Sequence, residues 1–237
     1  ERLVGETADP DGYAEMSIVR CQMCTAQADF DSIIRYMDGV IDSSLETGND
    51  RNLVLGLGHT AWSMVSLNRF DDAWIKAQET VALARRIGDR LHEADMKAAA
   101  LPLVYVRNGE QDAALISARE GVRLARRIGS VTVVADGEWI TADILRSRGR
   151  YEEALAAGQR SIEAAMPLES FMPFYLVHPL GVVGTTYLEI SDRFTDKIAG
   201  WKKSGFHLPD IIGNRDQFLK NFVAHARELV DEHDAEV

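Results

Sequence analysis

The sequence has few cysteines and no long apolar run, and both shortages exclude classes of protein. Only Cys21 and Cys24 stand among its 237 residues, so a disulfide framework is excluded and a reducing, cytoplasmic setting is expected. No stretch approaches the roughly 20 apolar residues of a membrane span. No basic segment followed by an apolar core indicates a secretory signal. We therefore expect no membrane partner.

Basic charge is also scarce, with 26 Lys and Arg against 37 Asp and Glu and a net charge of −11. A nucleic-acid partner needs an excess of cations that neutralise phosphates, so none is expected. Residues 1–83 carry 6 basic and 14 acidic side chains, residues 84–165 carry 13 and 12, and residues 166–237 carry 7 and 11. The arginines of the middle third are matched by acids, which argues against a polybasic patch.

Motifs for catalysis and metal binding are missing as well. The chain has no Gly-x-Gly-x-x-Gly, no Walker-type Gly-Lys-Ser/Thr and no Gly-x-Ser-x-Gly, which are patterns of nucleotide sites and activated serines. Its six histidines are scattered and form no close pair suited to a metal ion. We expect no catalytic residue, no metal site and no cofactor.

What the sequence does contain is a repeat. The hexapeptide Leu-Ala-Arg-Arg-Ile-Gly occurs at 83–88 and again at 124–129, 41 residues later. The preceding turns also align, at 28–34, 67–74, 108–115, 148–155 and, more weakly, 191–198, and they bring Ala73, Ala114 and Ala154 into register. A period of this length is typical of stacked supersecondary units.

The sequence pattern predicts two helices in each unit. Apolar residues recur every three or four positions in 111–128, which is the spacing of a helix stripe. Asp89 and Ser130 are suited to cap the helices that follow the hexapeptides. No segment shows the two-residue alternation of a strand. The fold class is therefore predicted to be all-α.

One helical hairpin cannot bury its apolar face alone, whereas stacked copies form a continuous core. We predict one domain over 1–237, a right-handed α-solenoid with hairpins near 12–48, 50–88, 89–129, 130–166 and 170–204. An amphipathic helix at 212–233 is expected to cap the array.

The repeats resemble the tetratricopeptide repeat (TPR) family. The family's small residue in the first helix corresponds to Cys21, Ala61, Ala142 and Thr185, and Pro102 departs from it. The period of about 40 residues exceeds the family's usual ~34. This longer variant is similar to the C-terminal TPR regions of bacterial nucleotide cyclases and ATPase-coupled transcriptional regulators. The resemblance implies a regulatory, protein-binding role in bacterial signalling and carries over no catalytic activity.

Two features allow a chemical or a structural interpretation. Cys21 and Cys24 form a Cys-x-x-Cys, but they fall on the repeat's internal positions, so we predict packing rather than a redox or zinc site. The paired arginines of the hexapeptide could bind an anion. We predict instead that they end a helix, with Gly88 and Gly129 as left-handed caps and the arginines near the negative end of the helix dipole.

The concave face formed by the first helices is the predicted partner site. Counting along the repeat places these residues on it: Glu15, Ile18, Gln22, Gly58, Trp62, Ser66, Met96, Leu103, Arg107, Asp136, Trp139, Asp143 and Arg146. The candidate binding residues are Gln22, Trp62, Arg107, Trp139, Asp143 and Arg146, because Trp and Arg are enriched at binding hot spots. Core packing of both tryptophans is the alternative.

Three functions follow from this interpretation. The first is a non-catalytic module that binds a peptide or helix of a protein partner. The second is self-association into a homodimer through an exposed terminal hairpin. The third, a small-molecule-binding or enzymatic solenoid, needs titratable residues converging in one pocket, and the sequence shows only scattered ones. The chain begins with Glu1 rather than Met, so we expect a trimmed chain or a piece of a longer one.

Overall fold

The computed structural model describes residues 10–168 and 173–193, and over these residues it contains helices and no strand. The elements are α2 (Pro10–Ala26), α3 (Phe30–Thr47), α4 (Asp50–Ser66), α5 (Phe70–Ile87), α6 (Arg90–Asp95), the π-helical turn η1 (Met96–Ala100), α7 (Leu101–Arg107), α8 (Gln111–Ile128), α9 (Val131–Ser147), α10 (Tyr151–Ala165), the 3₁₀ turns η2 (Met166–Leu168) and η3 (Pro173–Leu176), and α11 (Val177–Arg193). None of these helices has the length and apolar content needed to cross a bilayer.

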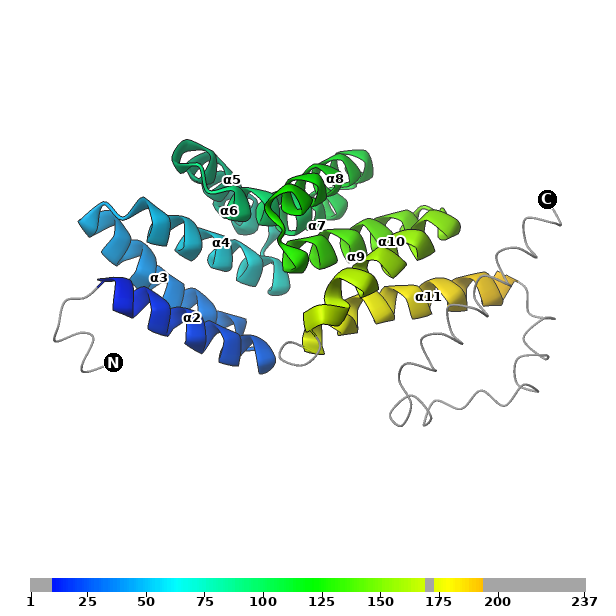
Figure 1. Cartoon of the computed structure of the whole chain (residues 1–237), viewed down its shortest axis with the longest axis horizontal. Helices are drawn as coiled ribbons and strands as arrows, with labels where there is room; N and C mark the ends of the chain where they lie inside the picture. Colours follow the sequence, from blue (N-terminus) through cyan, green and yellow to red (C-terminus); the bar gives the residue numbers. More distant parts are fainter. Residues whose placement is uncertain (1–9, 169–172, 194–237) are drawn as a thin grey trace.

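The helices stack in antiparallel pairs along an arch whose open side lies between α2 and α11, with α5 and α8 on the outside (Figure 1). Over the described residues the predicted all-α solenoid is confirmed, and the hand of its superhelix stays a prediction. The second helix expected in the fifth hairpin and the helix expected at 212–233 lie outside the described residues.

The repeated hexapeptide ends two helices as predicted. Gly88 and Gly129 adopt φ of 77° and 75°, the left-handed region that glycine enters without a Cβ clash. Asp89 then caps α6 by accepting the backbone N–H groups of Leu91 and His92. Ser130 is the N-cap residue of α9, as predicted, but its hydroxyl makes no cap hydrogen bond to the helix backbone.

The interior is built from small residues at the repeat positions. Ala73, Ala114 and Ala154 are at most 1% exposed, so neighbouring helices approach closely at these points. Cys21 is buried and packs in the first hairpin's core beside the half-buried Cys24. Burial, with a smaller contribution from Cys24, raises the pKa of the Cys21 thiol to about 11. The predicted packing role of this pair is confirmed.

The third repeat holds one more residue than its neighbours, and the structure shows where. Left-handed glycines stand at 88 and 109, 21 residues apart, whereas the next two stand at 129 and 149, 20 apart. The π-helical turn η1 takes up this extra residue. Pro102, two residues after this turn, lacks the N–H that would bond to a carbonyl in it. The Ser117 hydroxyl donates to the Lys97 carbonyl instead, at 2.9 Å.

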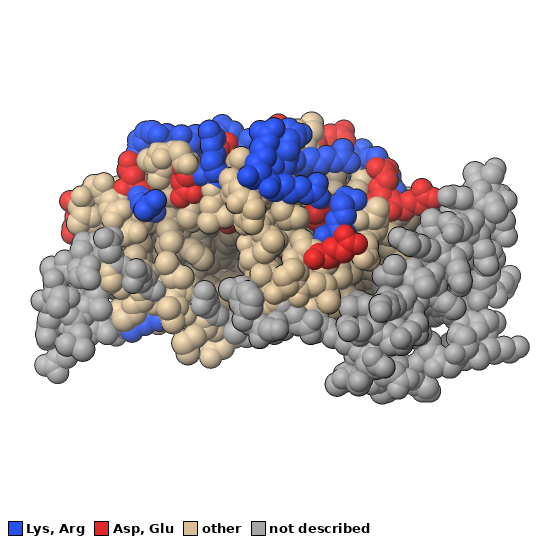
Figure 2. Space-filling view, in the orientation of Figure 1, with Lys and Arg blue, Asp and Glu red and all other residues tan. Residues whose placement is uncertain are grey.

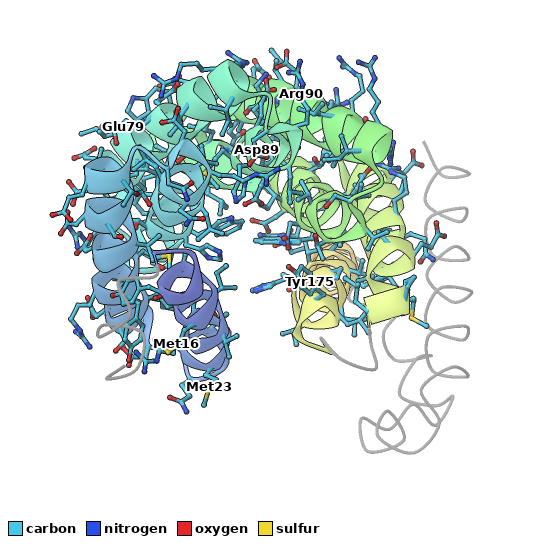
Figure 3. All side chains as sticks on the ribbon, turned by 60° about the vertical axis from the view of Figure 1, so that its left-hand side comes forward. Met16, Met23, Glu79, Asp89, Arg90 and Tyr175 are labelled. Atoms are coloured by element: carbon cyan, nitrogen blue, oxygen red, sulfur yellow. The ribbon has the colours of Figure 1, made fainter. Side chains whose placement is uncertain are left out.

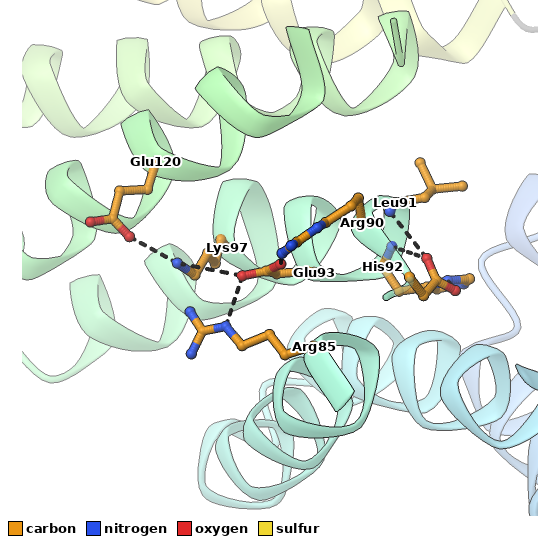
Figure 4. Close-up of polar contacts among 8 residues, drawn as sticks. Arg85, Arg90, Leu91, His92, Glu93, Lys97 and Glu120 are labelled. Atoms are coloured by element: carbon orange, nitrogen blue, oxygen red, sulfur yellow. Dashed lines mark hydrogen bonds and ion pairs between the residues drawn. The ribbon is translucent and has the colours of Figure 1, made fainter. Parts of the chain in front are cut away.

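Buried glutamates join successive repeats. Glu93, 7% exposed, accepts hydrogen bonds from Arg85 of the preceding helix at 2.7 Å and from Arg90 at 2.8 Å (Figure 4). Lys97 lies 4.0 Å from the same carboxylate. The first arginine of the hexapeptide therefore lies near a helix terminus and also forms an ion pair with the next repeat.

The second hexapeptide repeats this arrangement. Arg126 donates to Glu138 at 2.6 Å, and Arg160 reaches the same carboxylate from α10 at 2.8 Å. Glu138 is 5% exposed, so its charge is compensated mainly by these two guanidinium groups. Neither glutamate is predicted as an interhelical ion-pair partner by the repeat pattern of the sequence.

Candidate binding groove

Two tryptophan–aspartate pairs occupy the concave side of the arch. Trp62 of α4 donates its indole N–H to Asp95 of α6, with 3.2 Å between Nε1 and Oδ2. Trp139 of α9 donates in the same way to Asp136, with 3.4 Å between Nε1 and Oδ1. Each indole is thus fixed by a carboxylate rather than by a neutral acceptor, which makes the bond charge-assisted whenever the aspartate is ionised.

Both tryptophans belong partly to the core and partly to the groove. Trp62 packs against the two largest core clusters and so bridges the second and third repeats. Trp139 packs against one cluster and stacks on His178 of α11, with ring centroids 4.8 Å apart and planes inclined by 17°. Each side chain nevertheless keeps part of its surface accessible. Both interpretations, core packing and exposure to the groove, therefore apply to these two tryptophans.

The two carboxylates are partly buried, and the charge of Asp95 disfavours ionisation of Asp136. Burial raises the pKa of Asp95 to about 6, although the His92 charge and the Trp62 hydrogen bond act in the opposite direction. Burial, together with the Asp95 charge, raises the pKa of Asp136 to about 8, while its hydrogen bond from Trp139 acts against this. Near pH 7 the pair therefore tends to hold a single negative charge.

Tyr175 of η3 completes this environment from the C-terminal half of the arch. It lies beside the opening between the two halves of the arch (Figure 3). Burial raises the pKa of its phenol, and the charges of Asp136 and Asp95 raise it further, despite a hydrogen bond with Thr132. Aromatic faces, two carboxylates and a phenol thus converge on one part of the groove. Such a set favours a cation, because aromatic rings and carboxylates both attract positive charge.

Asp95 is a groove residue that sequence reasoning missed. The count back from Pro102 pointed to Met96, but Met96 is fully buried at 0% exposure, and this prediction is wrong. The extra residue in η1 displaced the count by one position. Asp95 follows Gly88 by seven residues, as Asp136 follows Gly129. Counting forward from the glycine caps would have found it.

The other predicted residues are distributed along the same helices. Asp143 and Arg146 lie further along α9 and pair with each other at 2.7 Å, and Arg146 also pairs with Glu189 of α11. Arg107 lies over the Phe70 ring, 5.9 Å from its centroid. These contacts fix Arg146 between α9 and α11.

Two further predicted groove positions have different outcomes. Gly58 is buried, with His92, Thr80 and Met96 around it, so its predicted groove position is wrong. The side chain of Gln22 lies outside the described part of the structure. Among the described residues, no group of three or more His, Cys, Asp or Glu is arranged to hold a metal ion.

The comparisons with known proteins support the fold alone. No protein-family model and no curated protein matches the sequence. BtubC (BKLC) from P. vanneervenii is similar in structure, with a TM-score of 0.61 and 16% identity over 87% of each chain. A Rap protein complexed with Competence and Sporulation Factor also has a TM-score of 0.61, with 14% identity over 94% of this chain.

At such identities the likeness concerns the helical solenoid. This chain spans 66% of the length of the Rap chain, so the activities of the whole Rap protein are not a property shown for it. The resemblance to TPR proteins rests on the repeat pattern and on this shared architecture.

Proposed function

We propose that this chain is a non-catalytic, TPR-like interaction module whose concave groove binds a peptide or helix carrying a basic side chain. We place it as a regulatory segment of a cytoplasmic bacterial signalling protein, without nucleic acid or membrane as partner. The Rap protein, which shares the fold, was solved with a bound factor, and this supports a partner-binding role.

One observation carries the proposal: two partly buried aspartates repel each other between two partly accessible indoles. A Lys or Arg side chain placed between them would relieve this repulsion and lie against aromatic faces. Binding should then displace the proton that Asp136 holds near pH 7. Affinity is expected to rise between pH about 6 and about 8, because the competing proton is lost over that range.

A second candidate function, self-association, is supported by apolar exposure on the first described helix. Val19 and Met23 of α2 are 57% and 62% exposed, and Met23 lies at the edge of the arm in Figure 3. A dimer through α2 would cover these side chains. Light scattering of the wild type and of Met23→Glu distinguishes the two cases, since only a dimer through α2 loses mass in the variant.

The proposal is tested by selecting binders from a random peptide display library against the immobilised chain. We expect the recovered peptides to be enriched in Lys and Arg. Their affinity should fall by roughly tenfold in Trp139→Ala and in Asp136→Asn. The matched controls are Trp74→Phe on α5 and Asp112→Asn on α8, which lie outside the groove.

Two results would contradict the proposal. One is a peptide set without basic residues. The other is equal loss of affinity in the groove variants and in the controls, which would indicate that binding depends on general stability or charge.

A further inference from the structure

A cleft on the side of the second helices gathers five arginines of the middle repeats. It has a volume of about 630 Å³ and lies between α8 and α10, with Glu138 and Thr141 of α9 at its lining. Figure 2 shows basic side chains concentrated along the upper side of the molecule, where Figure 1 places α5, α6 and α8. The arginines that line the cleft are Arg119, Arg123, Arg126, Arg127 and Arg160.

The floor of this arginine cleft holds two guanidinium groups in place. Glu138 is bound on one side by Arg126 and on the other by Arg160, at 2.6 and 2.8 Å. The two arginines come from opposite walls and remain 54% and 44% exposed. Because each guanidinium has five N–H donors, both retain donors beyond those used on the carboxylate. A shared buried acid therefore draws two cations together across the cleft.

The remaining three arginines have no such partner. Arg119, Arg123 and Arg127 follow one another at intervals of four residues along one ridge of α8, with about 6 Å of rise per step. Within the described residues, no carboxylate lies within ion-pair distance of any of the three. Like charges at this spacing destabilise a helix by a few tenths of a kcal/mol per pair.

The two copies of the hexapeptide differ in the partner of their second arginine. Arg86 occupies the same position of the hexapeptide as Arg127, but it is neutralised by Asp50 at 3.1 Å. In the second copy of the motif Arg126 is paired with Glu138, whereas Arg127 takes part in no ion pair among the described residues. The chain carries a net charge of −11, so the excess of positive charge lining this cleft runs against the overall charge of the protein.

Size and charge restrict what could fill the cleft. Five arginines against two glutamates leave an excess of three positive charges, and Glu153 is already paired with Arg150 at 2.6 Å. Cavities of about 300–1,000 Å³ are typical of small-molecule sites. Glu163 on α10 is exposed, and its charge would repel an extended polyanion such as a duplex or a lipid surface.

We infer that the arginine cleft binds the diphosphate group of a small molecule. A diphosphate carries about three negative charges in a compact shape, and its oxygens accept the paired N–H donors of guanidinium groups more completely than one carboxylate does. Arg126 and Arg160 form the preorganised base of the site, and Arg119, Arg123 and Arg127 supply its charge. This site lies on the helices away from the groove and is independent of the peptide proposal.

Calorimetric titration of the full chain tests this inference, with inorganic pyrophosphate, ADP, inorganic phosphate and citrate as separate ligands. Pyrophosphate and ADP are expected to bind more tightly than phosphate, and citrate, of similar charge, is expected to bind at least tenfold more weakly than pyrophosphate. Tighter binding of ADP than of pyrophosphate would identify a nucleotide as the source of the diphosphate. Equal binding would show that the free diphosphate is sufficient.

The hexapeptide provides a matched pair of variants. Arg127→Ala should weaken pyrophosphate binding by roughly tenfold, whereas Arg86→Ala removes the same charge from the same repeat position and should change it less than twofold. Arg123→Ala serves as a second variant in the cleft, and the thermal unfolding of each variant checks that it is folded. Three results overturn the inference: no binding of pyrophosphate or ADP, citrate binding as tightly as pyrophosphate, or equal losses in Arg127→Ala and Arg86→Ala.

Discussion

Gly121 on α8 is the point where the third repeat is least able to accept a larger side chain. A Cβ added there would lie 2.2 Å from the Ala98 backbone nitrogen, 2.5 Å from the Ala98 Cα and 2.7 Å from the Ala94 carbonyl oxygen. All three are backbone atoms, two of them in the π-helical turn η1. They cannot rotate away as a side-chain terminus would.

The cost of Gly121→Ala follows from two opposing effects. Alanine is favoured over glycine within a helix by about 1 kcal/mol. Relieving the contacts requires the backbones of α8 and η1 to separate by more than about 1 Å, and overpacking of this kind costs roughly 1–3 kcal/mol or more when only backbone can move. We expect a net loss of about 2 kcal/mol, which corresponds to a fall in Tm of roughly 4–8 °C for a chain of this length.

Urea unfolding followed by circular dichroism measures this loss, and Gly181→Ala is the matched control. Gly181 is exposed on α11, where an added Cβ meets no atom within 4 Å. There the helix propensity acts alone and should stabilise by about 0.5–1 kcal/mol. If Gly121→Ala is as stable as the wild type, the close approach of α8 and η1 is not a constraint on the fold and the reasoning is refuted.

Three further predictions concern ionisable groups. Asp136→Asn should gain stability over the wild type as pH rises from about 4 to about 8 and keep a constant advantage of roughly 5–6 kcal/mol above that, because the folded-state pKa of about 8 exceeds the unfolded one and each pKa unit corresponds to about 1.4 kcal/mol; unfolding at several pH values measures it. Glu138→Gln should lose about 1–2 kcal/mol in urea, since its guanidinium partner Arg126 is half exposed. In the native chain at pH 8, iodoacetamide should leave Cys21 unmodified until unfolding, whereas Cys24 reacts sooner; mass spectrometry of the peptides shows the order.

The features that recur in each repeat could be predicted from the sequence. The hexapeptide placed Gly88 and Gly129 as helix caps, and the alignment of Ala73, Ala114 and Ala154 placed the core, because position within the unit determines both. These predictions depend on local geometry that each unit forms in the same way.

Features that arise between repeats were not predictable in this way. Glu93 and Glu138 stand at different distances from their helix caps, and only the packed structure shows that each meets an arginine of the preceding repeat. The same holds for the hydrogen bond from Trp62 to Asp95, which joins residues 33 positions apart. Such pairs depend on the angle between helices, which hydrophobic periodicity does not determine.

The π-helical turn has a consequence for how this chain can vary. An extra residue inside a regular α-helix would rotate everything beyond it by about 100° around the axis, and residues of the inner face would turn away from the groove. Here the insertion is absorbed within residues 96–100. Asp95 before the turn and Arg107 after it therefore keep their positions around the helix axis. One codon gained or lost in this turn would alter the length of the repeat without changing which side chains face the groove. Related arrays could therefore differ in length here and still present the same side chains to a partner.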